Sequence, residues 1–140
     1  MKEILCTTCG ILGAAIAKLF GGWSDGMTTL IIFMAIDYFS GMLVAAVFQK
    51  SKKTESGALS SLACWQGLIK KGITLLIVLI ACRLDLMTQT DYIRDACVIA
   101  FCVSEAISIL ENAGLMGVPI PAVITKAIDV LKDESKGDAE

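Results

Sequence analysis

Residues 27–48 read MTTLIIFMAIDYFSGMLVAAVF, an apolar stretch whose one charged residue, Asp37, lies near its middle. A helix over this stretch would be about 33 Å long, because an α-helix rises about 1.5 Å per residue. That length is enough to cross the hydrocarbon core of a bilayer, which is about 30 Å thick. The stretch therefore predicts a transmembrane helix and sets the fold class of the chain.

Three further stretches predict membrane spans, at about residues 4–20, 68–87 and 96–113. The first is slightly short for a bilayer, and a cleaved signal peptide is its alternative interpretation. Hydrophobic residues make up 56% of the chain and charged residues 19%, whereas soluble domains average about 45–50% and about 25%. We therefore expect an all-α integral membrane protein with about four transmembrane helices.

The distribution of lysines predicts the orientation in the membrane. Residues 49–71, between the second and third predicted spans, contain five lysines and one glutamate. Short cytoplasmic loops collect Lys and Arg. We expect this segment to be cytoplasmic, and with four spans both termini would be cytoplasmic too.

The chain changes character after residue 118. Pro119 and Pro121 end the last span, because proline lacks a backbone N–H and fixes its own φ. From Ala122 the apolar residues recur at helical spacing, which predicts a short amphipathic helix on the inner membrane surface. Residues 132–140 are charged and are expected to be disordered. The sequence thus predicts a transmembrane domain, residues 1–118, and a cytoplasmic region, residues 119–140.

The composition argues against an enzyme. The chain has no histidine, which excludes Ser-His-Asp and Cys-His catalysis as well as His-containing metal sites. Cys6 and Cys9 form a single C-x-x-C with no second pair, so we expect no zinc site. There is no basic domain that would indicate nucleic-acid binding. No nucleophile–base pair and no cofactor motif stands out.

Charged residues inside the predicted spans need an explanation, because an Asp at mid-helix costs about 2.5–3.5 kcal/mol on insertion scales. They would line a water-filled interior, meet a partner charge, or be protonated and hydrogen-bonded to a neighbouring helix. A Lys71–Glu105 pair is sterically plausible, and Glu111 is a competing partner for Lys70 or Lys71. The candidate pore or pairing residues are Asp37, Lys71, Glu105, Ser108, Glu111 and Asn112.

Small residues recur at four-residue spacing in the first two predicted spans, which lets helices approach closely. Ordinary packing within a bundle and contact between copies in an oligomer both explain such stripes. The residues concerned are Gly10, Gly13, Ala14, Ala17, Gly41 and Ala45.

Several motifs together resemble the toxin-secretion/phage-lysis holins. Asp37-Tyr38-Phe39-Ser40-Gly41 is similar to the family's D-Y-x-[ST]-G signature, and Lys70-Lys71-Gly72 is similar to the start of its third segment. Residues 105–114, EAISILENAG, resemble its E-x-x-S-I-x-E-N stretch, and residues 117–121 its G-x-P-x-P. Ala106 departs from the pattern, where a glycine would be expected. The resemblance covers roughly residues 10–132.

The resemblance implies a small phage or prophage protein of the host cytoplasmic membrane. Such holins oligomerise and open lesions through which a cell-wall hydrolase, the endolysin, reaches the peptidoglycan. The partners implied are the lipid bilayer, further copies of the chain and an endolysin. The alternative cargo is a large toxin or bacteriocin, which the membrane lesion would release. A small-solute transporter subunit is a third hypothesis, although the repeated halves typical of transporters are not visible.

Overall fold

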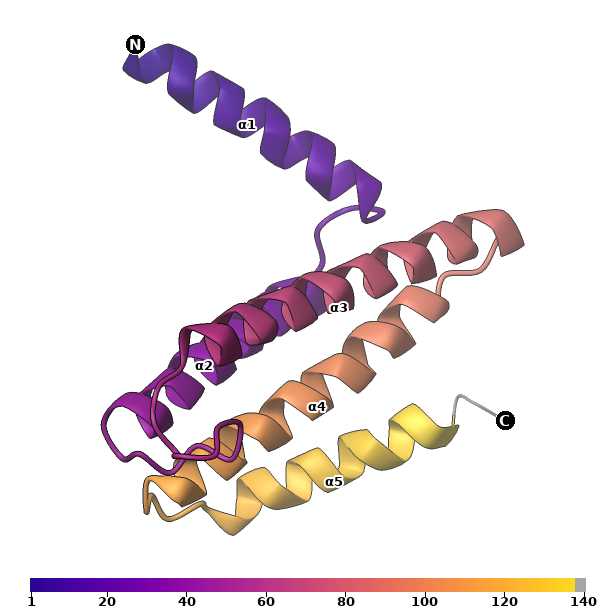
Figure 1. The fold of residues 1–140 in the computed structure, drawn as a ribbon. Coiled ribbons are helices and arrows are strands. Elements are labelled where there is room, and N and C mark those ends of the chain that lie inside the picture. The colour runs from indigo at the N-terminus through magenta and orange to yellow at the C-terminus, as the bar shows by residue number, and fades with distance from the viewer. Residues whose placement is uncertain (138–140) are drawn as a thin grey trace.

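The computed structural model describes residues 1–137. For residue 132 and residues 134–137 it describes the backbone alone. Five helices follow one another along the chain (Figure 1). Their bounds are Lys2–Leu19 for α1, Asp25–Ala46 for α2, Ser61–Thr88 for α3, Ile93–Leu115 for α4 and Ala122–Gly137 for α5.

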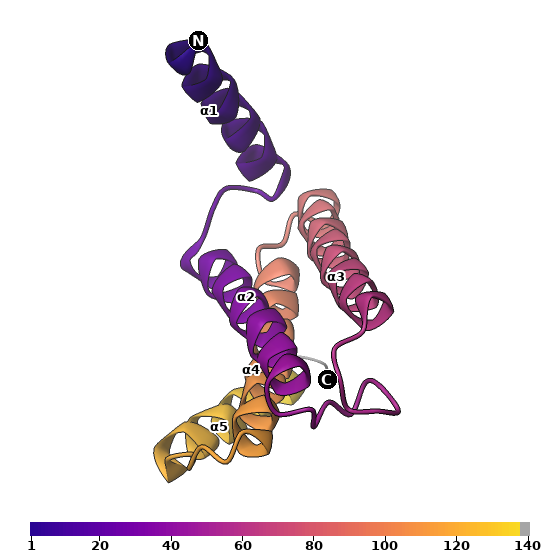
Figure 2. The same ribbon diagram turned by 60° about the vertical axis from the view of Figure 1, so that its left-hand side comes forward.

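Helices α2, α3 and α4 form a bundle in which α2 packs mainly against α4, and α3 lies alongside both (Figures 1 and 2). Ser24 starts α2 as its N-cap, and its hydroxyl accepts a hydrogen bond from the backbone N–H of Met27 at 3.2 Å. Apolar side chains from the three helices meet in one core: Met27, Leu30, Met34, Val78 and Val98. The core thus lies nearer to the α3–α4 turn than to the α2–α3 linker, residues 47–60.

Helix α1 stands apart from this bundle and projects from the end that carries the α3–α4 turn (Figures 1 and 2). None of its residues is buried. The Arg94 guanidinium holds its end by donating a hydrogen bond to the carbonyl of Phe20 at 3.0 Å. Gly21 follows with φ +73°, where a Cβ atom would come 2.9 Å from Cys82 Sγ. Glycine is therefore required at this position for two reasons, its positive φ and the lack of space for a Cβ atom.

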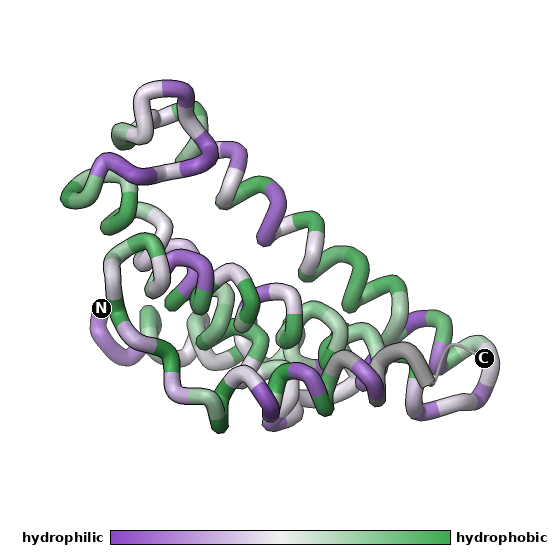
Figure 3. The backbone as a smooth tube through the Cα atoms, turned by 90° about the horizontal axis from the view of Figure 1, so that it is seen from below, coloured by the Kyte–Doolittle hydropathy of each residue, from purple (hydrophilic) through white to green (hydrophobic). Residues whose placement is uncertain are grey.

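By length and composition, α2 is the one described helix suited to crossing a membrane. The other predicted spans form helices α1, α3 and α4, but each contains more charged residues than α2. Helices α1 and α3 nevertheless expose large apolar side chains, whereas α4 exposes none. In Figure 3 the middle of α3 is coloured as apolar, whereas the α2–α3 linker is largely polar.

The third helix begins earlier than the sequence suggested. It starts at Ser61 instead of about residue 68, after Ser60 in an extended conformation (φ −129°, ψ 130°). Serine is a favoured N-cap residue, and the Leu, Ala and Gln that follow are good helix formers. Lys70 and Lys71, which the prediction placed near the start of this span, consequently lie well inside α3.

The C-terminal helix also differs from expectation. Disorder was expected from residue 132, but α5 continues to Gly137, and residues 138–140 lie outside the described residues. Lys and Glu, which recur in this stretch, are good helix formers, so charge alone does not end a helix. In the structure α5 packs against α4 and buries Ile128. Its position on a membrane surface therefore stays a prediction.

The α3–α4 turn is organised by Asp85, which is buried near the end of α3. Its carboxylate accepts hydrogen bonds from the backbone N–H groups of Ile93 at 3.0 Å and Arg94 at 2.8 Å, and from the Thr90 hydroxyl at 2.7 Å. Tyr92, the N-cap residue of α4, makes no side-chain capping bond. Asp85 therefore caps α4 from the preceding helix and fixes the angle between the two.

We expect Asp85→Ala to lower the midpoint of thermal unfolding in detergent, because the first N–H groups of α4 lose their acceptor. Asp85→Asn keeps one acceptor oxygen and should have a smaller effect. Asp91→Ala is the matched control, since Asp91 is exposed in the same turn. Unfolding is measured by circular dichroism. Equal midpoints for Asp85→Ala and Asp91→Ala would contradict the capping role.

Candidate functional site

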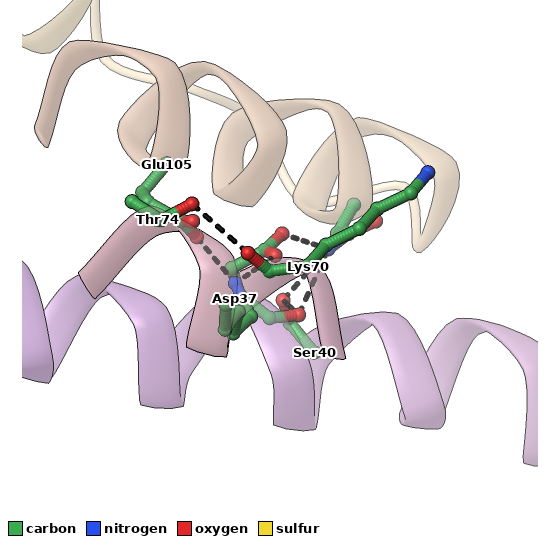
Figure 4. A network of polar contacts seen from close by, with 7 residues as sticks. Asp37, Ser40, Lys70, Thr74 and Glu105 are labelled. Carbon is green, nitrogen blue, oxygen red and sulfur yellow. Dashed lines mark hydrogen bonds and ion pairs between the residues drawn. The ribbon is translucent and has the colours of Figure 1, made fainter. Parts of the chain in front are cut away.

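Lys71 is the centre of an ionic cluster that joins α2, α3 and α4, and Figure 4 shows its partners Asp37 and Glu105. Its Nζ atom lies 2.7 Å from Asp37 Oδ2 on α2 and 2.6 Å from Glu105 Oε2 on α4. The exposed fractions of the three side chains are 15% for Lys71, 8% for Asp37 and 14% for Glu105. All three charges are thus largely removed from solvent.

Asp37 is also held from α4 by an amide. The Asn112 side chain donates to Asp37 Oδ1 at 3.2 Å and to the Ser40 hydroxyl oxygen at 2.9 Å. Ser40 in turn donates to the backbone carbonyl of Asp37 at 3.1 Å. Both carboxylate oxygens of Asp37 therefore have a partner, as a buried carboxylate requires.

The spacing along each helix explains why these groups meet. Glu105 and Asn112 are seven residues apart on α4, which is about two turns, so they lie on the same face of that helix. Lys71 reaches Asp37 and Glu105 because its flexible four-carbon stem extends from α3 into the space between the other two helices. Removing Lys71 would leave both carboxylates without their ammonium partner, and breaking a buried pair in this way costs about 3–5 kcal/mol.

The remaining predicted polar residues lie around this cluster. Ser108, between Glu105 and Asn112 on α4, is half-buried beside the Asp37 carboxylate. Glu111 is exposed, because a residue adjacent to Asn112 points about 100° away around the helix. Figure 4 shows Lys70 extending away from the cluster. Lys71, not Lys70, thus meets the carboxylates, and it meets two.

The structure separates the small residues into two groups. Ala45 is buried, and Gly41 lies where a Cβ atom would be 3.6 Å from Asn112 Nδ2, so both face the interior of the subunit. The stripe of α1 is different. Gly10 and Gly13 have no neighbouring atoms within 4 Å of an added Cβ, and Ala14 is exposed. Ala17 is partly exposed.

Sequence reasoning did not identify three of these contacts. The Lys71–Asp37 pair and the Asn112–Ser40 bond join helices whose relative register is not visible in the sequence. The spacing in the sequence could have identified Ser40 as a neighbour of Asp37, because a residue three positions later lies near the same face of a helix. The contact of Arg94 with the carbonyl of Phe20 had no such signal.

Chemically, the arrangement is a closed charge cluster. The ammonium group of Lys71 is shared by two carboxylates, and Asn112 is neutral. None of these groups is a nucleophile with an adjacent base. The cluster can hold three helices together. It also puts charged groups in the middle of the bundle, where they can interact with water or with another charged group.

Comparison with known proteins places this arrangement in a family context. Residues 14–133 match the model of the bacteriophage holin family. An uncharacterized protein of Halalkalibacterium halodurans is 34% identical, with 97% of this chain and all of the relative covered. An uncharacterized protein of Listeria innocua is 36% identical, covering 94% of this chain and 89% of that protein.

A further relative has a functional name. A probable holin of Bacillus phage phi105 is 29% identical over 92% of this chain and 90% of its own length. No solved structure matches the chain. Because the family model covers most of the sequence, from residue 14 to residue 133, the protein belongs to the bacteriophage holin family, a family of non-enzymatic phage membrane proteins.

Proposed function

We propose that the chain assembles in the cytoplasmic membrane of the host and opens lesions through which an endolysin escapes to the cell wall. The family match over residues 14–133 carries this proposal. The structure supports it through its surface, because large apolar side chains are exposed along α1, α2 and α3. Soluble monomers rarely expose contiguous apolar areas of this extent.

The proposal includes four spans, although three of the helices contain several charges. The contacts within the bundle support this, because many of these charges have partners. Lys71 and Glu105 are joined with Asp37. Asp85 caps α4, and Arg94 binds backbone carbonyls at the end of α1. Paired and hydrogen-bonded charges are the form in which ionisable residues are tolerated within membranes.

The proposed orientation places the α2–α3 linker and both termini in the cytoplasm. Positive charges outnumber negative ones in residues 49–71 even when Lys71 is not counted. The lysines are Lys50, Lys52, Lys53 and Lys70, and the one acidic residue is Glu55. In the structure α1 points away from the bundle. A cytoplasmic N-terminus therefore requires α1 to fold back along α2 and α3 by rotation about Gly21 and Gly22, both at positive φ.

We further propose that contact between copies uses α1. One subunit has no room for a protein-sized passage, so release of an endolysin needs an oligomer. The stripe of Gly10, Gly13, Ala14 and Ala17 has the small side chains that membrane helices use for close approach. Gly41 and Ala45 are occupied within the subunit, which leaves α1 as the better surface for a second copy.

Lysis by this chain should depend on a separate endolysin. We expect inducible co-expression with an endolysin that lacks a signal peptide to give an abrupt fall in culture density. The chain alone should stop growth without rapid clearing, and the endolysin alone should do neither. Clearing by the endolysin at the same rate without this chain would exclude the proposed role.

The topology is testable at Glu55, in the middle of the linker. We expect a cysteine at position 55, in a variant without other cysteines, to resist membrane-impermeant thiol reagents in intact cells and to react after the membrane is opened. A cysteine at position 89, in the α3–α4 turn, should react in both. Labelling of position 55 from outside would reverse the proposed orientation.

The ionic cluster should control lysis timing. Lys71→Met and Glu105→Gln should each change the time of lysis, and their effects should be coupled by about 0.5–3 kcal/mol in unfolding measurements. The double variant still leaves Asp37 without its ammonium partner, so adding Asp37→Asn should bring lysis time closer to the original. Glu111→Gln is the control on the exposed side of α4. Strict additivity of Lys71→Met and Glu105→Gln would show that the two act independently.

A further inference from the structure

A cavity of about 160 Å³ opens between α2, the α2–α3 linker and α3, next to the ionic cluster. Most of its wall is uncharged, including Met42, Ala45 and Ala63. Its charged groups come from four segments of the chain, which are α2, the linker, α3 and α4. These groups are Asp37, Lys53, Lys70, Lys71 and Glu105.

The cavity has an excess of positive charge. Three lysines face two carboxylates, and both carboxylates bind Lys71. Among the described side chains, Lys53 and Lys70 take part in no ion pair. Lys53 Nζ lies 3.9 Å from where a Cβ of Gly41 would be, so it reaches over α2 to the cavity. One net positive charge is therefore left for a ligand.

A second hollow adjoins this cavity along the outer face of α3. It has a volume of about 330 Å³ and shares Tyr38, Leu59 and Cys64 with the cavity wall. The rest of its lining includes Trp65 and Leu68, both exposed. A basic cavity thus continues into an apolar groove that faces outward from the bundle.

We propose that the cavity and the groove together bind one anionic phospholipid, with its phosphodiester at Lys53 and Lys70 and an acyl chain along Trp65 and Leu68. A phosphodiester carries one negative charge, which balances the excess in the cavity. The cavity is smaller than the ~300–1,000 Å³ of pockets that enclose whole ligands, so it accommodates a head group alone. Free phosphate would satisfy the lysines equally well, but it would leave the apolar groove unused.

This assignment goes beyond the proposed lysis function and requires only that the chain lies in a membrane. Basic pockets between membrane helices on the cytoplasmic side bind the head groups of anionic lipids. Trp65 agrees with such a position, because tryptophan is enriched at the membrane–water interface. The lipid would connect α3 to the linker at the end of the bundle that has the smaller apolar core.

Tryptophan quenching tests the proposal on the full chain. The chain has two tryptophans, so Trp23→Phe makes Trp65 the reporter. The variant is reconstituted in phosphatidylcholine vesicles containing a fixed fraction of brominated phosphatidylglycerol or brominated phosphatidylcholine. Measurements at 1 M salt, where the Debye length is about 3 Å, suppress general surface attraction. At this salt concentration we expect brominated phosphatidylglycerol to quench Trp65 more strongly than brominated phosphatidylcholine at the same fraction, because only direct contact with the lysines distinguishes the two lipids.

Variants in the same background identify the lysines responsible. Lys53→Gln with Lys70→Gln should abolish the preference, and Lys53→Arg with Lys70→Arg should retain it. Lys52→Gln removes the same charge from the neighbouring exposed position outside the cavity and should leave the preference unchanged. Equal quenching by the two lipids in the parent, or equal loss in Lys52→Gln, would overturn the proposal. Displacement of brominated phosphatidylglycerol by millimolar inorganic phosphate would overturn the lipid assignment.

Discussion

One ammonium group shared by two carboxylates fixes how the three central helices stand relative to one another. Lys71 Nζ can be within 2.7 Å of both Asp37 and Glu105 only in one register of α2, α3 and α4. Apolar contacts fix this register less strictly, because the hydrophobic effect is non-directional. A buried charge fixes it closely, since a shift of one turn, about 5.4 Å, would strand it in a medium that solvates it poorly.

This constraint divides the bundle into two unlike halves. Towards the α3–α4 turn lies the apolar core around Leu30 and Val78, closed at its end by Asp85 and Arg94. Towards the linker the apolar core gives way to a cavity with basic groups. The first half resembles a packed interior, and the second is open to ligands.

The sequence predicted the elements better than their contacts. All four predicted spans are helices, because apolar runs of that length and composition leave few alternatives. The start of α3 was missed because Trp65 and Gln66 occur in a segment that looked like a linker, and Ser60 before the helix makes no side-chain capping bond. The Lys71–Glu105 pair could be suggested from depth in the membrane. The pairing of Asp37 with Lys71 could not be suggested, because it depends on how α2 is rotated about its axis.

The same physics distinguishes what can move from what must stay. Separating α2, α3 and α4 would break two ion pairs and expose a carboxylate held by Asn112. Moving α1 breaks little beyond the hydrogen bonds of its last residues with Arg94 and Cys82. The assembly proposed above would therefore move α1 against a second copy while the bundle keeps its charges paired. Helix α1 is therefore the part of the subunit whose movement breaks the fewest contacts, and the ionic cluster is the part that keeps α2, α3 and α4 together.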